Sequence, residues 1–216
     1  MITSTNEYSH TIGIASFEGR GFMNPIDVVF NNNLLYVLSR SNASNKNNRV
    51  SVLTLDSDHK FEFANWGEDS GKSILPTAIA IDKEDNFILS DEHLNRISIF
   101  DLEGNFIKHW GEFGNKQGQL NRPSGISVDS ENNILIVDHL NSRIQKFDNN
   151  GKFISSFGKY GNDESEFNYP WGIDTDKDQN IYVADWRNNR IQIFNSQGNY
   201  LSSIEKYEDQ NLNKPS

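Results

Sequence analysis

The sequence predicts an all-β fold of the β-propeller type, built from four-stranded antiparallel blades. Two observations support this. First, five prolines recur at intervals of 51, 47, 47 and 45 residues, at Pro25, Pro76, Pro123, Pro170 and Pro215. Second, each full interval holds four short segments rich in Ile, Val, Phe and Tyr, separated by Asn, Asp and Gly clusters. A four-stranded unit repeating every ~40 to 50 residues is typical of a propeller blade. Helical repeats would need apolar positions at helical spacing, and none are present.

Four blades and two partial elements are expected along the chain. The blades are expected at about residues 22–66, 73–111, 120–158 and 167–204. A lone outer strand is expected at 8–17, before the first blade. Residues 212–216 (LNKPS) repeat the start of the third blade (LNRPS), so they are expected to begin a fifth. The sequence is therefore expected to be a fragment of a longer reading frame. A native open array of four blades is the alternative, and it would expose a terminal apolar face.

An aspartate and an arginine recur at fixed phase in three of the repeats. The pairs are Asp91 with Arg96, Asp138 with Arg143, and Asp185 with Arg190. Each aspartate ends a second strand and each arginine begins a third strand. A charge-assisted hydrogen bond across the loop is expected, as a structural pair rather than a site. The first repeat differs, because Arg40 occupies the aspartate position and a four-residue insertion precedes Arg49.

The third and fourth repeats of the chain resemble the NHL repeat over nearly their whole length. They are RPSGISVDSENNILIVDHLNSRIQKFDNNG and YPWGIDTDKDQNIYVADWRNNRIQIFNSQG. The second repeat is similar except that Leu94 stands where Asn141 and Asn188 stand later, and the first repeat is the weakest. The resemblance covers about residues 18–216 and implies a six-bladed propeller.

Charge and composition disfavour several function classes. The chain of 216 residues has 30 acidic and 20 basic side chains, a formal net charge of −10. Nucleic-acid binding is not favoured, because phosphate binding usually needs a basic surface, and attraction to an anionic membrane is disfavoured likewise. The absence of cysteine excludes disulfides, cysteine zinc sites and thiol nucleophiles. No signal peptide or membrane span is visible, so the compartment is unknown and the cytoplasm is the default expectation.

Strand direction predicts one functional face. The starts of the first strands and the loops between second and third strands lie at the same rim, and loops on a rigid scaffold tend to carry function. The candidates for ligand or partner contact on this rim are Arg40, His93, His139, Trp171, Trp186 and Arg187. The two indoles of Trp171 and Trp186 are expected to be neighbours there, although packing between blades is the alternative. The two histidines are expected to be solvated, since a zinc site needs three or four converging ligands.

Two further tryptophans are expected in the core. Trp66 and Trp110 each precede a glycine near the end of a repeat, where Phe157 stands in the third repeat. This position is expected in the fourth strand, packed between blades.

No catalytic residue, metal or cofactor is expected. The peptidyl-hydroxyglycine lyases have a similar six-bladed ring, and a resemblance to them would imply zinc-binding histidines directly after each blade proline. This sequence has other residues there, namely Ile26, Thr77, Ser124, Trp171 and Ser216. The favoured function is a non-catalytic scaffold that binds a protein, a peptide or a small ligand on the rim. The alternative is part of a propeller enzyme of lyase or hydrolase type with its catalytic residues in further blades. A nucleic-acid-binding NHL domain is the least favoured.

Overall fold

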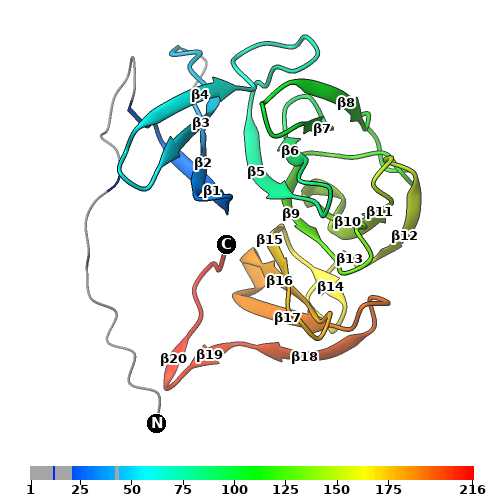
Figure 1. Ribbon diagram of the computed structural model, residues 1–216. Coiled ribbons are helices and arrows are strands. Elements are labelled where there is room, and N and C mark those ends of the chain that lie inside the picture. The colour runs from blue at the N-terminus through cyan, green and yellow to red at the C-terminus, as the bar shows by residue number, and fades with distance from the viewer. Residues whose placement is uncertain (1–11, 13–20, 42–43) are drawn as a thin grey trace.

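The structure, a computed structural model, describes residue 12, residues 21–41 and residues 44–216. Four antiparallel sheets of four strands follow one another along the chain and are arranged around a central axis (Figure 1). The first strands of the four sheets line this axis and lie beside one another. The predicted all-β propeller architecture with four blades is confirmed.

The blades share one strand order, from the innermost strand outward. The first blade contains β1 (Pro25–Asn31), β2 (Leu34–Ser39), β3 (Arg49–Thr54) and β4 (His59–Phe63). The second contains β5 (Pro76–Ile81), β6 (Phe87–Asp91), β7 (Arg96–Phe100) and β8 (Phe106–Trp110). The third contains β9 (Pro123–Val128), β10 (Ile134–Asp138), β11 (Arg143–Phe147) and β12 (Phe153–Phe157). The fourth contains β15 (Pro170–Thr175), β16 (Ile181–Asp185), β17 (Arg190–Phe194) and β18 (Tyr200–Ile204). Each blade therefore begins at one of the repeated prolines.

Short elements connect or follow the blades. Strands β13 (Lys159–Tyr160) and β14 (Glu166–Phe167) pair in parallel, and β19 (Lys206–Tyr207) and β20 (Gln210–Asn211) pair antiparallel. The 3₁₀ turns η1 (His139–Asn141) and η2 (Trp186–Asn188) follow the second strands of the third and fourth blades. These turns place side chains at the rim.

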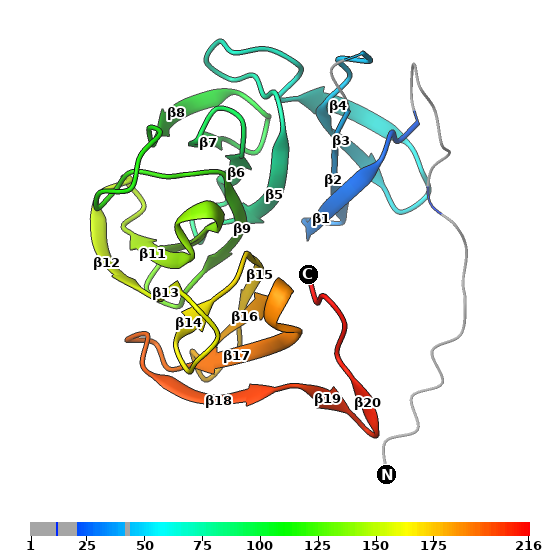
Figure 2. The same ribbon diagram turned by 180° about the vertical axis from the view of Figure 1, so that it is seen from behind.

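The two chain ends differ from the regular blades. The lone outer strand expected at 8–17 lies outside the described residues, apart from Ile12. Residues 212–216 form no strand, yet they keep the phase of the repeat. The Lys214 amide donates to Asn189 Oδ1 at 3.0 Å, as the Arg122 amide donates to Asn95 Oδ1 at 2.8 Å two repeats earlier. The last residue lies near the central axis in both views (Figures 1 and 2).

The hydrophobic core lies between the blades. Side chains alternate across each strand, so a blade between two others needs apolar residues on both faces. In the second blade, Leu89 packs toward the first blade and Ile88 toward the third. Three such clusters fill the three spaces between successive blades.

The first blade has one uncovered face. By register, Val28 of β1 is the counterpart of Ile79 of β5, because each lies opposite the matching residue of its second strand. Ile79 is 4% exposed, whereas Val28 is 54% exposed. The difference arises because the first blade covers Ile79, and nothing in the described part of the chain covers Val28 to the same degree.

The register corrects the alignment of the first repeat. Ser39 lies opposite both Pro25 and Arg49, as Asp91 lies opposite Pro76 and Arg96. The aspartate position is therefore occupied by Ser39, and the assignment of Arg40 to it is wrong. Sequence spacing misplaced it because the turn between β1 and β2 is shorter than its counterparts, which brings the end of β2 nearer to the proline.

The register also corrects the position of Trp66. Trp110 ends β8, and its indole lies 4.5 Å from the Phe147 ring, in the expected space between blades. In the first blade Phe63 holds this place, opposite Val50. Trp66 lies further on and bridges to Ser73, in a position that Phe113 repeats in the next blade. Trp66 is thus half-buried in the connection between blades, not in the fourth strand.

Candidate functional site

The repeated Asp–Arg pairs are present in the third and fourth blades. The Arg143 Nε donates to Asp138 Oδ2 at 2.7 Å, and the Arg190 Nε donates to Asp185 Oδ2 at 2.9 Å. Both carboxylates are fully buried. The Arg143 guanidinium also donates to three carbonyl oxygens of the loop that enters its blade, those of Asn115, Lys116 and Gln119. Each pair thus ties an entry loop to the blade that follows.

The second blade departs from this pattern, and the predicted Asp91–Arg96 hydrogen bond is not formed. The Asp91 carboxylate instead accepts from four backbone amides, those of Ile74, Leu75, His93 and Leu94. The Arg96 guanidinium donates to three carbonyls of its entry loop, while its buried Nε has no partner. In the later blades an Asn and a Gln side chain also donate to the aspartate carboxylate. The equivalent positions of the second blade hold Leu94 and Ser98. That difference explains the changed geometry.

One rim of the propeller gathers the residues that differ from blade to blade. Each first strand begins opposite the end of its second strand, as Pro170 opposite Asp185 shows. The residue that directly follows the second strand therefore lies at this rim in every blade. That position holds Arg40, Glu92, His139 and Trp186 in turn. The buried pairs repeat, whereas this position changes, so the rim carries the asymmetry that a specific site needs.

An aromatic pocket opens at this rim between the third and fourth blades. It has a volume of about 260 Å³ and is lined by His139, Tyr169, Trp171, Trp186 and Ser216. The His139 ring meets the Trp171 ring at 5.0 Å and an angle of 89°, and the Tyr169 ring at 5.2 Å. The structure thus brings Trp171 and Trp186 to one pocket, and both indoles remain partly exposed.

His139 is buried, so the expectation of a solvated side chain is wrong for it. Only 8% of the residue is exposed. Its Nδ1 lies 2.8 Å from the Pro170 carbonyl oxygen. A carbonyl can only accept, so Nδ1 carries the proton and Nε2 carries the lone pair of the neutral ring. Burial lowers the pKa of His139 below its ordinary value, mainly because the charged ring would lose its hydration. The imidazole is therefore a neutral aromatic wall at physiological pH.

Cationic side chains surround the mouth of the pocket. The Arg187 guanidinium lies 4.1 Å from the Tyr169 ring centre, and the Lys214 ammonium lies 5.0 Å from the Trp186 ring centre. Arg122 acts electrostatically on His139, as Arg187 does. The predicted candidate Arg187 thus belongs to the pocket.

Two other candidates lie elsewhere on the rim. Arg40 donates to Glu92 Oε1 at 2.6 Å, which joins the first blade to the second. The Glu92 side chain is only 9% exposed, so the pair is largely shielded from water. His93 is exposed and takes no part in the pocket. The rim therefore runs from an ion pair at the early blades to an aromatic pocket at the later ones.

The residues after the blade prolines have a structural task in two blades. The Thr77 hydroxyl donates to the Pro123 carbonyl at 3.0 Å, and the Ser124 hydroxyl donates to the Trp171 carbonyl at 2.8 Å. Both residues are buried. These hydroxyls link neighbouring first strands, so they do not form part of the pocket.

Sequence reasoning missed Tyr169 and Lys214, which contribute to the pocket and its mouth. Both directly precede a blade proline, as Arg122 does, and all three have a left-handed backbone with φ of 56°, 49° and 54° respectively. This conformation turns the residue before the proline toward the rim. The residue before each blade proline falls at a fixed position of the repeat, so the sequence held a signal for this position as well as for the residue after the proline.

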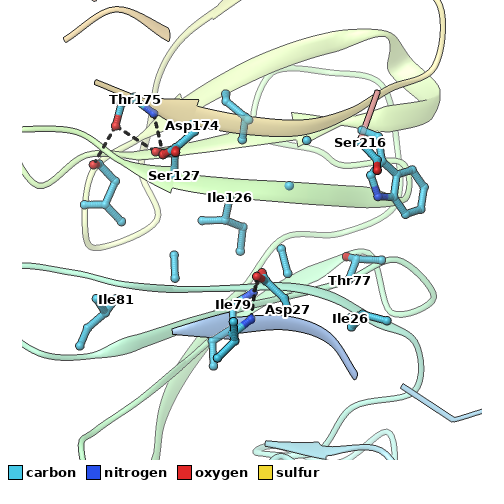
Figure 3. Close-up of a pocket in the computed structure, with 18 residues that line it drawn as sticks. Ile26, Asp27, Thr77, Ile79, Ile81, Ile126, Ser127, Asp174, Thr175 and Ser216 are labelled. Atoms are coloured by element: carbon cyan, nitrogen blue, oxygen red, sulfur yellow. Dashed lines mark hydrogen bonds between the residues drawn. The ribbon is translucent and has the colours of Figure 1, made fainter. Parts of the chain in front are cut away.

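A central channel lies between the four first strands (Figure 3) and adjoins the aromatic pocket. Its volume is about 640 Å³, and the four first strands line it together with Ser216. Asp27 accepts from the Ile79 amide at 2.9 Å, and burial raises the pKa of its carboxyl. Asp174 lies toward the end opposite Thr77 and Ser216 (Figure 3). Trp171 and Ser216 line both cavities, so the pocket lies at the mouth of the channel.

Among the described residues, no group of three or more His, Asp or Glu side chains could hold a metal ion. In the same part of the chain, no helix has the length and apolarity needed to cross a membrane.

Comparison with known proteins identifies the repeat. The family model "NHL repeat" matches residues 120–147 and 167–194. These ranges contain the first three strands of the third and fourth blades. A sequence comparison with curated proteins found no match.

Similar solved structures include enzymes with propeller folds. A streptogramin B lyase is 16% identical, with a TM-score of 0.64 over 84% of this chain and 54% of that one. The virginiamycin B lyase of Staphylococcus aureus is 15% identical, with a TM-score of 0.63 over 83% of this chain and 55% of that one. The hydrazine synthase of Kuenenia stuttgartiensis is 13% identical, with a TM-score of 0.61 over 94% of this chain and 52% of that one. The chain spans about half the length of these proteins. At such low identity the similarity concerns the fold alone.

Proposed function

We propose that this chain, an NHL-repeat protein with a β-propeller fold, is a non-catalytic binding module. Its site is the aromatic pocket at the channel mouth, which receives one apolar side chain or ring of a protein, a peptide or a small ligand. The observation that carries the proposal is the convergence of four rings, from His139, Tyr169, Trp171 and Trp186, on one open pocket.

The size and lining of the pocket support an anchor of one ring. Pockets for drug-sized molecules usually measure about 300 to 1,000 Å³. The aromatic pocket, at about 260 Å³, lies just below that range. A buried aromatic pair contributes about 0.5–1.5 kcal/mol beyond the area that it removes from water. One inserted ring therefore fits the pocket, and such anchors commonly dominate protein interfaces.

The pocket is preorganised, which favours binding. Ser124 and His139 hydrogen-bond to the backbone carbonyls of Trp171 and Pro170. Arg187 stacks on Tyr169. Side chains already held in place lose little conformational entropy when a ligand binds.

A catalytic role at this pocket is less well supported. General acid–base chemistry needs a titratable group within hydrogen-bond reach of a second polar group or of the reacting atom. The single imidazole in the lining donates a hydrogen bond from Nδ1 to the Pro170 carbonyl oxygen, and its Nε2 has no hydrogen-bond partner among the described residues. The remaining lining residues are Tyr169, Trp171, Trp186 and Ser216. Binding therefore accounts for the lining better than catalysis does.

The test uses a neutral aromatic probe and variants of the two indoles. N-acetyl-4-fluorophenylalanine amide is titrated with the chain, and broadening of its ¹⁹F line reports binding. Trp171→Ala and Trp186→Ala should each weaken binding roughly tenfold or more while circular dichroism and urea unfolding still show a folded chain. Phe113→Ala removes a ring that is 69% exposed outside the pocket and serves as the control. Unchanged affinity in both tryptophan variants contradicts the proposed site.

A further inference from the structure

We propose that the pocket recognises an acidic peptide segment, in which one aromatic side chain enters the pocket and flanking carboxylates pair with the cations at its mouth. The inference rests on the proposed binding function and adds the chemistry of the partner. It is carried by the Arg187 and Lys214 side chains, which lie against the Tyr169 and Trp186 rings, together with Arg122, which acts electrostatically on the buried His139.

The cations at the mouth remain available to a partner. Arg187 and Lys214 lie against ring faces, and among the described residues neither forms an ion pair with a carboxylate. A guanidinium that lies on an aromatic ring keeps the N–H groups at its edge free to donate to a carboxylate. The side chain of Arg187 is also exposed. The stacked cations are thus positioned for anionic groups that approach from outside.

The acidic side chain near the mouth does not cancel this charge. Glu92 acts electrostatically on His139, but its carboxylate is held by Arg40 at 2.6 Å. Burial keeps His139 neutral. Arg187 and Lys214 therefore keep positive charges at the mouth without a carboxylate partner among the described residues, on a chain whose formal net charge is −10. Charges farther than about 10 Å away are largely screened at ordinary ionic strength, so the nearby cations dominate for a bound segment.

The same arrangement disfavours a cationic ligand. Aromatic pockets can bind ammonium groups through the faces of their rings. Here Arg187 already lies on Tyr169 and Lys214 on Trp186. A basic side chain would have to displace these cations or lie beside them at a cost in repulsion. The cations consequently select against basic partners as well as for acidic ones.

The placement of the cations favours an extended segment over a single small carboxylate. Arg122 precedes the third blade, Arg187 follows the second strand of the fourth, and Lys214 precedes Pro215 at the next repeat. Successive repeats therefore supply them along an arc of the rim. A peptide with carboxylates on both sides of an aromatic residue can pair with more than one of them at once.

The test compares three blocked tripeptides with 4-fluorophenylalanine at the centre. The flanking residues are both Glu, both Gln or both Lys, and dissociation constants are measured by ¹⁹F titration and calorimetry. The Glu peptide should bind roughly five- to tenfold more tightly than the Gln peptide, and the Lys peptide more weakly than the Gln peptide. The advantage of the Glu peptide should shrink between about 50 mM and about 500 mM salt.

Two variants test whether the tighter binding of the Glu peptide depends on the cations at the mouth of the pocket. Arg187→Gln and Lys214→Gln should each reduce the advantage of the Glu peptide and leave the affinity for the Gln peptide nearly unchanged. Lys177→Gln makes the same charge change at an exposed turn between β15 and β16, at the opposite rim, and should leave the advantage intact.

The outcomes separate this inference from the proposed function. Equal affinities for the Glu and Gln peptides overturn the acidic partner and leave the pocket as a binding site. Equally tight binding of free N-acetyl-4-fluorophenylalanine and of the Glu peptide overturns the assignment to a peptide segment. Failure of all three peptides and of the neutral probe to bind overturns both proposals.

Discussion

The imidazole of His139 meets the indole of Trp171 edge to face, with ring centres 5.0 Å apart. His139 follows the second strand of the third blade, and Trp171 begins the fourth blade directly after its proline. The contact therefore crosses a blade boundary and excludes water from the imidazole. It connects the chemistry of the pocket to the packing of the propeller, and several measurable consequences follow from this and related contacts.

His139 should make the stability of the chain depend on pH. Burial lowers the pKa of His139 below its ordinary value of 6.5, so the unfolded chain binds more protons between the two pKa values. Linkage then requires the free energy of unfolding to rise with pH in that window. The contribution is complete above about pH 6.5 and is lost as the pH falls toward the lowered pKa of the folded state.

Urea unfolding at several pH values tests this dependence. We expect His139→Gln to flatten the increase in unfolding free energy between about pH 5 and about pH 7. His93→Gln changes an exposed imidazole and should leave the increase as it is. An unaltered slope in the His139 variant means that the ring titrates in the folded state as it does in the unfolded chain.

Substitution of the repeated arginines should distinguish the second blade from the third. Arg143→Lys loses the 2.7 Å hydrogen bond from Nε to the buried Asp138, whereas the Arg96 Nε has no partner to lose. A hydrogen bond to a charged group contributes about 1.5–3 kcal/mol. Arg143→Lys should thus lower the free energy of unfolding by roughly 1–2 kcal/mol more than Arg96→Lys. Chemical denaturation of the two variants gives the comparison, and equal losses argue against a stabilising role for the Asp–Arg hydrogen bond.

Two glycines with the same backbone conformation should respond differently to alanine. Gly118 and Gly151 have φ of +80° and +82°. A Cβ on Gly151 would lie 2.4 Å from the Trp110 ring, whereas on Gly118 its nearest neighbour would be Phe153 Cβ at 3.8 Å. Gly118→Ala should cost about 1–2 kcal/mol from backbone strain, and Gly151→Ala about 1–3 kcal/mol more from the clash. Thermal unfolding measures both, and similar costs indicate that the indole moves aside freely.

Truncation of a side chain on the exposed face of the first blade should cost less stability than truncation at the equivalent, covered position of the second blade. Val28 and Ile79 occupy equivalent positions, with exposed fractions of 54% and 4%. Val28→Ala should change the free energy of unfolding by no more than about 0.5 kcal/mol, and Ile79→Ala should lower it by about 2–5 kcal/mol. A loss at Val28 that approaches the loss at Ile79 reveals that something covers this face in solution.

Repetition made much of the fold predictable from the sequence. Each blade proline begins a first strand, because its fixed φ suits the start of a strand that needs no earlier ladder bond. The alternation of apolar residues set which side chains fill the spaces between blades. The first repeat was the exception. In this repeat the turn after the first strand is shortened and the loop after the second strand is lengthened. Counting residues from the proline therefore assigned the aspartate position to Arg40 instead of Ser39.

The pocket could be predicted only in part. Chain direction was enough to place Trp171 and Trp186 at one rim. The burial of His139 was not, because it depends on a ring and a carbonyl oxygen that lie 30 or more positions away in the chain. The inclusion of Tyr169 and Lys214 depends on a left-handed backbone before proline, a conformation that this position ordinarily disfavours. Such contacts arise from the packing of whole blades rather than from local sequence pattern.

The residue that directly follows each second strand varies from blade to blade, although the strands around it repeat. Arg40, Glu92, His139 and Trp186 occupy this position in turn, and in the last three blades it directly follows a buried aspartate. Substitutions at this position change the chemistry of the rim, and at Arg40 and Glu92 they also change an ion pair that joins two blades. Varying this single position in each repeat therefore offers a combinatorial route to rims of different chemistry.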